Sequence, residues 1–386
     1  MLNNFLPYSL PQLGEEEINE VVDSLRSGWI TTGPKAKRFE SDFASYLGDG
    51  VQALAVNSAT SGLHLALEAV GVKVGDEVIV PTYTFTASAE VVRYFGAHPV
   101  FVDSDPNTFN IDVNAIEQAI TPKTKAIIPV HFAGLACDMD KIIELARKYN
   151  LKVIEDAAHA FPTRYKDKLI GTLDTDATVF SFYANKTMTT AEGGMLVSKD
   201  PKIISRCKVM RLHGISRDAF DRYQSTTPAW YYEIVAPGFK YNMPDICAAI
   251  GIHQLKRIDG FYEKRKNMAK KYDETLKDLP IILPPQPKEH CTHAWHIYPI
   301  RLTADCKISR DDFISKMAQQ GIGCSVHFIP LHKQPFWKNK YNLQSSSFPV
   351  AEEIYGNVVS IPLFTAMTDQ DQNRVIKEIH NVLNKS

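Results

Sequence analysis

The sequence predicts an α/β fold in which a mostly parallel central sheet is accompanied by a smaller domain. Short apolar runs recur along the first half of the chain, and helical patterns separate the earlier ones. Buried parallel strands read as such continuous runs, and their alternation with helices puts helices on both faces of the sheet. The chain has 386 residues, more than a single hydrophobic core usually serves. We therefore expect a large α/β domain over residues 1–250 and a smaller α+β domain over residues 251–386.

Local patterns predict the elements of the large domain in order. Two amphipathic helices precede a strand near residues 51–56, and a further helix starts after Asn57 and Ser58. The other apolar runs that predict strands are 77–81, 99–103, 124–130, 151–155, 178–182 and 195–198. A helix is expected over 138–149, whereas residues 217–236 show no period and predict a long loop.

The C-terminal third carries a different pattern. A continuous helical pattern over residues 244–279 leads into a proline-rich segment, 279–287, which suits a domain boundary. The elements expected after it are extended segments at 293–302 and 322–328 and helices at 309–320 and 368–383. Together these elements predict the smaller α+β domain.

Composition excludes several classes of partner. The 43 Lys and Arg nearly balance the 44 Asp and Glu, so no global field attracts nucleic acid. No segment approaches the roughly 20 apolar residues of a membrane span, and the N-terminus lacks the pattern of a secretory signal. The six cysteines form no CxxC pair or metal-ligand pattern, which is typical of reduced thiols. We expect a cytoplasmic protein without a metal, a membrane or a nucleic acid as partner.

Residues just after the predicted strands are the first candidates for a binding site, because open α/β sheets bind ligands beyond the carboxyl ends of their strands. These residues are Asn57, Ser58, Thr82, Phe85, Asp103, His131, Asp156 and His159.

Asp156 and Lys186 carry the strongest chemical indication. A carboxylate after a buried strand needs a cationic or hydrogen-bonding partner, and a protonated pyridine nitrogen would be one; Asp156 could equally cap the next helix. Lys186 follows another predicted strand, and a lysine in a desolvated site could form a Schiff base with a carbonyl cofactor. A lone lysine is usually a solvated charge. The order of strand, Asp156, strand and Lys186 favours the chemical interpretation.

Two further segments are compatible with a phosphorylated planar ligand. The small residues of NSATSG, which include Ala59 and Thr60, leave the N–H groups of a helix start open to a phosphate. The alternative is an ordinary helix cap. Phe85 could lie on a planar ring or could simply pack in the core.

These elements in this order resemble the DegT/DnrJ/EryC1/StrS family of sugar aminotransferases, which are pyridoxal-phosphate (PLP) enzymes of fold type I, the aspartate-aminotransferase-like fold. The segments that carry the resemblance are SGWITTGP, NSATSGLHLAL, GDEVIVPTYTFTAS, ITPKTKAIIPVHFAG, VIEDAAHA, FSFYANK, AEGG, LHGI, PGFKYNMPD, HAWHIYPI and IGCSVHFIP. They cover nearly the whole chain. Among the branches of this family, the one that the chain resembles most makes UDP-4-amino-4-deoxy-L-arabinose.

The resemblance implies roles for matching residues. Lys186 would hold PLP as a Schiff base and shuttle a proton, Asp156 would pair with the pyridinium nitrogen, and His159 would steady the aspartate or the ring. The other residues implied to bind cofactor or substrate are Ala59, Thr60 and Ser181 at the phosphate, Asn242 at the phosphate of the neighbouring subunit, and Phe85, Tyr183 and His327 around the ring and the sugar nucleotide. His327 could instead be a satisfied histidine on a strand, and Asn242 could cap the helix that begins near Pro244.

The implied reaction moves an amino group from L-glutamate, leaving 2-oxoglutarate, to a nucleotide-linked keto-sugar, for which a UDP-4-keto-sugar is the first expectation. The active form would be a homodimer with shared sites. The arabinose branch usually has Trp in place of Phe85 and His-Ala-Ile in place of residues 183–185, so the sugar is less defined than the reaction. Amination at C3 is an alternative, and a PLP-dependent sugar dehydratase is another. Dehydratases of the family carry histidine in place of Lys186, and a relative without catalysis would lack Lys186 or Asp156.

Overall fold

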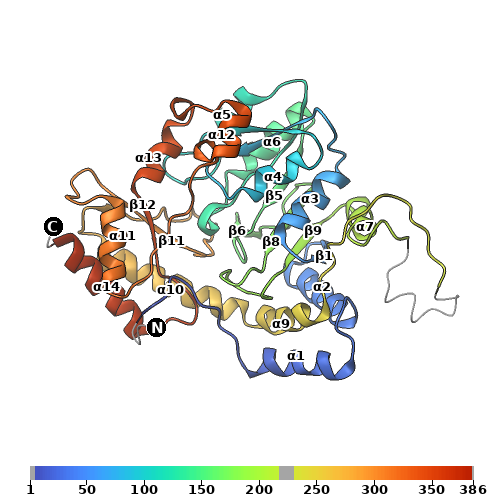
Figure 1. Ribbon diagram of the computed structural model, residues 1–386, viewed down its shortest axis with the longest axis horizontal. Coiled ribbons are helices and arrows are strands. Elements are labelled where there is room, and N and C mark those ends of the chain that lie inside the picture. Colours follow the sequence, from blue (N-terminus) through green and yellow to red (C-terminus); the bar gives the residue numbers. More distant parts are fainter. Residues whose placement is uncertain (1–4, 217–229, 385–386) are drawn as a thin grey trace.

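The computed structural model describes residues 5–216 and 230–384. Its main sheet consists of β1 (Gln52–Val56), β2 (Glu77–Pro81), β3 (His98–Val102), β4 (Thr124–Ile127), β5 (Lys152–Asp156), β8 (Ala177–Ser181) and β9 (Gly194–Ser198). The strand order is β1-β9-β8-β5-β4-β2-β3, and Figure 1 labels β1, β9, β8 and β5 of this sheet. β9 is antiparallel to β1 and β8, and the pairs from β8 across to β3 are parallel. The mostly parallel sheet is confirmed, and each predicted apolar run overlaps one of its strands.

Helices cover both faces of this sheet. One face is covered by α3 (Ala59–Ala69), α4 (Ala87–Arg93) and α7 (Pro201–Met210), and the other by α2 (Pro34–Leu47), α5 (Val113–Ala119), α6 (Met139–Tyr149) and α9 (Asp245–Lys256). Successive strand residues point to opposite faces: in β5, Val153 packs in the core with α2 and α6, and Ile154 packs in the core with α3. Burial on both faces explains why the strands show no polar alternation.

A second, antiparallel sheet lies in the C-terminal part. It is formed by β10 (Ile281–Ile282), β11 (Tyr298–Leu302) and β12 (Val358–Ile361), and it shares a core with α10 (Ile258–Leu276), α11 (Arg310–Gln319) and α14 (Asp369–Asn384). Figure 1 shows these helices gathered on one side of the molecule, where the chain ends. The short helices α12 (Pro335–Tyr341) and α13 (Pro349–Asn357) instead lie toward the main sheet, because Trp337 and Phe348 pack with its residues. A small hairpin, β6 (Arg164–Tyr165) and β7 (Lys168–Leu169), follows β5.

The helical pattern over 244–279 is confirmed and is divided into two helices, α9 and α10, which are separated at Arg257, where the guanidinium binds Glu17 of α1 (Glu15–Ser27). The segment expected to be extended at 322–328 belongs to no strand in the described part of the chain, where it makes isolated bridges from Ile322 to Leu6 and from Ser325 to Ser360. An extended segment becomes a strand only where an adjacent segment offers unpaired backbone N–H and C=O groups along its length.

The N-terminal segment runs beside the C-terminal part of the chain. The N–H of Leu6 donates to the carbonyl of Gly321 at 2.8 Å, and the N–H of Gly323 donates to the carbonyl of Leu6 at 2.9 Å. Most of the loop predicted at 217–236 lies outside the described residues. Within the described ranges, no helix combines the length and the apolar character that a bilayer crossing needs.

Candidate active site

A cavity of about 540 Å³ opens beyond the carboxyl ends of the parallel strands. Its walls include nine of the ten predicted site residues, namely Ala59, Thr60, Phe85, Asp156, His159, Ser181, Tyr183, Lys186 and His327. Some lie at the start of α3 and after β2, and others at or just after the ends of β5 and β8. His327 comes from the C-terminal part of the chain. Residues far apart in sequence therefore meet beyond the carboxyl ends of the strands, where the sequence predicts a binding site.

Lys186 is the cation of this cavity. Burial lowers the pKa of its amine to about 8, and the nearby charge of Asp156 acts in the opposite direction by favouring the protonated form. A lysine with an ordinary pKa near 10.5 is almost entirely protonated at neutral pH. The lowered pKa leaves a substantial neutral fraction of Lys186, which is the form that attacks a carbonyl carbon.

Asp156 is the last residue of β5 and is only 6% exposed. The hydroxyl of Ser88 donates to its Oδ2 at 2.7 Å, and the N–H of Ala158 donates to its Oδ1 at 3.1 Å. A carboxylate that accepts two hydrogen bonds in a buried position remains able to pair with a further cationic donor in the cavity.

The start of α3 is a candidate anion site. The Ser58 hydroxyl caps the helix by accepting the N–H of Ser61 at 3.1 Å, while the N–H groups of Ala59 and Thr60 precede the intrahelical bonds. Gly194 begins β9 directly against this turn: a Cβ on Gly194 would lie 2.8 Å from the nitrogen of Ala59. Backbone donors and the helix dipole are thus open to a phosphate from the cavity side.

Three histidines line the cavity, and sequence reasoning missed one of them, His296. The ring of His159 lies 4.3 Å from that of His296, measured between centroids, and stacks on Phe328 at 5.8 Å. Burial lowers the pKa of His159 and His296 well below the usual value, and the positive charge of Lys186 acts in the same direction. Both ring nitrogens of His296 are buried without a hydrogen-bond partner in the described structure.

His327 is held in place by a contact at its Nδ1 and by packing of its ring. Its Nδ1 lies 3.0 Å from the hydroxyl of Ser360, and its ring packs 5.4 Å from that of Tyr8. Burial lowers the pKa of His327 to about 4, so the ring is neutral near pH 7. The partner of Nδ1 is compatible with a structural histidine, and the position of the ring at the cavity is compatible with a substrate-binding residue, so both interpretations of His327 remain.

Four of the first candidates at the strand ends do not line the cavity: Asn57, Thr82, Asp103 and His131. Asn57 accepts the hydroxyl of Ser61 at its Oδ1, at 2.5 Å. Thr82 pairs with Nδ1 of His332 at 2.9 Å, and Asp103 accepts two N–H groups at the start of α13. His131 accepts the N–H of Cys137 at Nδ1, so its Nε2 carries the proton that it donates to Glu155 at 3.0 Å. These side chains bind neighbouring segments of the protein, and their prediction as site residues is wrong.

Asn242 is the predicted site residue outside the cavity of its own chain. Its Nδ2 donates to the hydroxyl of Thr32 at 2.6 Å, and its backbone bridges to Val56 beside the start of α3. The N-cap of α9 is Pro244, so the interpretation of Asn242 as a side-chain cap of this helix is wrong.

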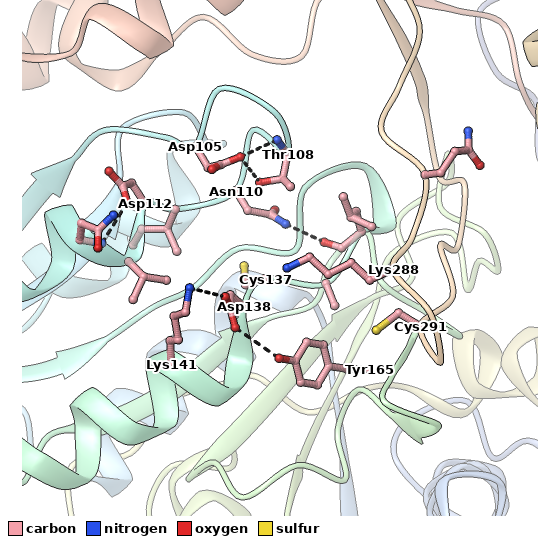
Figure 2. A pocket seen from close by; sticks show the side chains of 16 residues that line it. Asp105, Thr108, Asn110, Asp112, Cys137, Asp138, Lys141, Tyr165, Lys288 and Cys291 are labelled. Carbon is pink, nitrogen blue, oxygen red and sulfur yellow. Dashed lines mark hydrogen bonds and ion pairs between the residues drawn. The ribbon is translucent and has the colours of Figure 1, made fainter.

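A second cavity, of about 200 Å³, lies between α5, α6 and the segment near residue 288. Figure 2 shows that several of its polar side chains turn toward partners in the protein: Asp138 contacts Lys141 and Tyr165, and Asn110 donates to the carbonyl of Leu135. Because these groups are paired, the larger cavity around Lys186 is the candidate active site.

The chemistry of the larger cavity fits PLP. A reactive amine for the aldehyde, a buried carboxylate for the ring nitrogen and free helix N–H groups for the phosphate are the three partners that this cofactor needs. The fold and this site define a PLP-dependent enzyme of fold type I.

Comparison with known proteins identifies the family. A model of the DegT/DnrJ/EryC1/StrS aminotransferase family matches residues 11–380, and the chain belongs to this family. Uncharacterized protein MJ1066 of Methanocaldococcus jannaschii is 49% identical over 384 residues, covering 99% of each chain. Spore coat polysaccharide biosynthesis protein SpsC of Bacillus subtilis is 44% identical over 383 residues, covering 99% of this chain and 98% of SpsC.

A solved structure agrees over the full length. The putative sugar aminotransferase Spr1654 from Streptococcus pneumoniae, in its PMP form, has a TM-score of 0.91 at 36% identity, covering 98% of this chain and 99% of Spr1654. Its structure is also known in a PLP form. The predicted family, fold and cofactor are therefore confirmed.

Proposed function

We propose that this protein is a sugar aminotransferase that transfers an amino group from L-glutamate to a nucleotide-linked keto-sugar, most specifically a UDP-4-keto-sugar, to give the 4-amino sugar. The observation that carries the proposal is the meeting of Lys186 and Asp156 in one cavity at the sheet edge. The printed descriptions of SpsC, in polysaccharide biosynthesis, and of Spr1654, as a putative sugar aminotransferase, support the sugar as acceptor.

When bound, PLP supplies an electrophilic aldehyde and a ring that accepts the electron pair released from the substrate carbon. Lys186 would bond to the aldehyde carbon and, once displaced by the amino donor, would move the proton at the donor carbon. Asp156 would keep the ring nitrogen protonated, and Ser88 and Ala158 would fix the carboxylate for this task.

The remaining residues would bind and orient. The N–H groups of Ala59 and Thr60 and the hydroxyl of Ser181 would hold the phosphate, and Phe85 and His159 would hold the ring between them. Tyr183 and His327 would contact the sugar, since both border the cavity that contains Lys186. The chain departs from the arabinose branch at Phe85 and at residues 183–185, beside this sugar site, so amination at C3 is the alternative outcome.

An amino-transfer assay tests the proposal. The PLP-loaded protein is incubated with L-glutamate and a panel of UDP- and dTDP-linked 4-keto- and 3-keto-sugars, and products are identified by mass and by the position of the new nitrogen. We expect 2-oxoglutarate and a 4-amino sugar nucleotide in equal amounts. Release of water without nitrogen transfer would support a dehydratase, and a product aminated only at C3 would overturn the assignment to C4.

A further inference from the structure

His296 brings an unused hydrogen-bonding group into the active-site cavity. Its side chain lines the cavity together with Lys186, and the residue is only 3% exposed. Neither ring nitrogen has a hydrogen-bond partner in the described part of the chain. An imidazole carries a proton on at least one nitrogen, so the ring always offers a donor. Because a buried polar group without a partner costs free energy, its presence at the cavity wall indicates a ligand that pairs with it.

The backbone on both sides fixes this ring at the cavity. The N–H of His296 donates to the carbonyl of Ala133 at 3.0 Å, and its own carbonyl accepts Nη1 of Arg265 at 3.2 Å. Trp295, the preceding residue, has a φ of 51°, a left-handed conformation that bulky residues rarely adopt. Such a conformation persists only where its surroundings enforce it, and it is common at ligand sites. The unpaired nitrogens therefore belong to a ring whose orientation is set by the protein.

Two buried cations act on this ring. Arg265 is 2% exposed, and its guanidinium donates to three backbone carbonyls at 3.1–3.2 Å and to the hydroxyl of Thr365 at 3.2 Å, so within the described residues its charge meets no carboxylate. Burial lowers the pKa of His296, and the positive charges of Lys186 and Arg265 lower it further. The charges that disfavour a proton on the ring stabilise an anion placed against it.

The other charges of the cavity provide no fixed cation for an acidic amino donor. Lys186 is the only Lys or Arg among the described residues that line it, and its amine would be bonded to PLP. The two acids of the lining, Asp156 and Glu192, repel anions. L-Glutamate carries carboxylates, whereas the acceptor sugar is uncharged, and both react in this cavity. A neutral imidazole N–H can bind a carboxylate and leaves no unpaired charge when the sugar takes its place.

We propose that His296 binds a carboxylate of the amino donor through a ring N–H. The inference rests on the proposed function, because it takes L-glutamate to be the donor that reacts at Lys186. The buried charge of Arg265 adds to the attraction for the carboxylate. His296 thus acts in the first half of the reaction, where it favours an acidic donor over an uncharged amino acid.

Two matched variants of neighbouring histidines test the proposal. His296→Phe keeps an aromatic ring beside His159 but removes both nitrogens. His293→Phe removes a buried Nδ1 that accepts the N–H of Trp295 at 2.9 Å. Calorimetric titration of the PLP-loaded protein with glutarate, a dicarboxylate that has no amino group to react, measures the affinity for the donor's acid groups.

We expect His296→Phe to weaken glutarate binding by about tenfold, the effect of losing one hydrogen bond to a charged group. His296→Gln, which keeps an N–H donor, should restore much of the affinity, and His293→Phe should leave it unchanged. In the half-reaction with L-glutamate, His296→Phe should raise the donor concentration that gives half the maximal rate. The KM of the acceptor sugar should stay the same.

Thermal unfolding separates binding from a structural role. His296→Phe breaks no hydrogen bond within the described protein, so its Tm without donor should equal or exceed that of the wild type, whereas His293→Phe should lower the Tm. Because the ring of His296 borders the cavity, a larger side chain has room there. His296→Leu repeats the comparison with a smaller apolar side chain.

The outcomes are separable from those of the transfer assay. Absence of glutarate binding to the wild type, or equal affinity of the wild type and His296→Phe, overturns the proposal even if L-glutamate donates nitrogen. A lower Tm in both apolar variants, an equal loss of affinity in His293→Phe, or a matching rise in the KM of the sugar also overturns it. Glutarate binding that depends on His296, in a protein that aminates no nucleotide sugar, supports the proposal and contradicts the proposed function.

Discussion

Ser88 donates a hydrogen bond of 2.7 Å to Oδ2 of Asp156, across 68 positions of sequence. The hydroxyl of Thr84 lies 3.0 Å from that of Ser88, so Thr84 can supply the proton that Ser88 accepts. The hydroxyls of Thr84, which follows β2, and of Ser88, at the start of α4, therefore orient the carboxylate at the end of β5. These hydrogen bonds hold the carboxylate of Asp156 so that its remaining lone pairs can face the cavity.

The first prediction separates the charge of Asp156 from its orientation. Asp156→Asn should bind PLP but lose most of the rate of the half-reaction with L-glutamate, because the amide cannot stabilise a protonated ring nitrogen. Ser88→Ala keeps the charge and should slow the same step by about tenfold, which corresponds to one charge-assisted hydrogen bond. Stopped-flow absorbance of the bound cofactor measures both rates. Ser45→Ala, at an exposed serine of α2, is the matched control. A wild-type rate in Asp156→Asn would show that Asp156 does not stabilise a protonated ring nitrogen.

The second prediction concerns Lys186 itself. Lys186→Ala should abolish turnover and remove the visible absorption of covalently bound PLP, because no other lysine lines the cavity among the described residues. The far-ultraviolet circular dichroism should stay unchanged, since the side chain contributes little to the core. Lys256→Ala, at the exposed end of α9, removes a charge without touching the site. Normal turnover in Lys186→Ala would refute the assignment.

The third prediction follows from the pKa of Lys186, lowered by burial to about 8. In the protein without PLP, reductive methylation of Lys186 should rise with pH through a midpoint near 8, whereas surface lysines should react mainly above pH 10. The folded pKa is below the unfolded one, so the buried amine lowers stability at pH values below about 8, and this cost fades as the pH rises toward 10.5. Asp156 raises the pKa of the amine, so Asp156→Asn should shift the midpoint downward.

Peptide mass spectrometry at a series of pH values measures the extent of labelling at Lys186. A midpoint at or above pH 10 would show that the amine is solvated in the protein without cofactor. An upward shift in Asp156→Asn would contradict the proposed electrostatic contact between the two residues.

The parts of the fold that sequence predicted are those in which local pattern and tertiary environment agree. β2 and β5 are buried on both faces, so each reads as an apolar run, and the polar residue after such a run, Asp156, reaches the cavity. Thr82 and Asp103 follow similar runs but bind neighbouring elements. Position at a strand end restricts where a side chain lies, but it does not determine the direction in which the side chain points.

Other features depend on contacts that no local pattern reveals. Ser88 is the second residue of α4, and only the packing of α4 on the sheet brings it to Asp156. His296 reaches the cavity because its N–H binds the carbonyl of Ala133 at 3.0 Å and its carbonyl binds Arg265 at 3.2 Å. The break between α9 and α10 likewise coincides with the contact of Arg257 with α1. The HAWH segment was a family signal, but nothing within it marked which histidine is unpaired.

The last prediction is that two subunits share each active site. Asn242 lies outside the cavity of its own chain and is held at Thr32, so a role at a phosphate requires the cavity of a second subunit. Lys186→Ala and Asn242→Ala homodimers should each be weak, because every site in the first lacks the amine and every site in the second lacks the phosphate contact. A strictly intramolecular site also predicts weak homodimers, so a mixture of the two variants is the decisive measurement.

In a heterodimer with shared sites, both lesions fall in one site and the other site is wild type. Equal mixing with complete exchange should then restore roughly a quarter of the wild-type activity, because half of the dimers are mixed and each has one intact site. If Lys186 and Asn242 act within one subunit, every site of the mixture carries one lesion and activity does not rise. Differently tagged subunits and native mass spectrometry verify the exchange, and a mixture of Lys186→Ala with Lys256→Ala controls for activity contributed by intact subunits. Demonstrated exchange without recovery beyond the mean of the two homodimers would overturn the shared site and leave Asn242 a structural partner of Thr32.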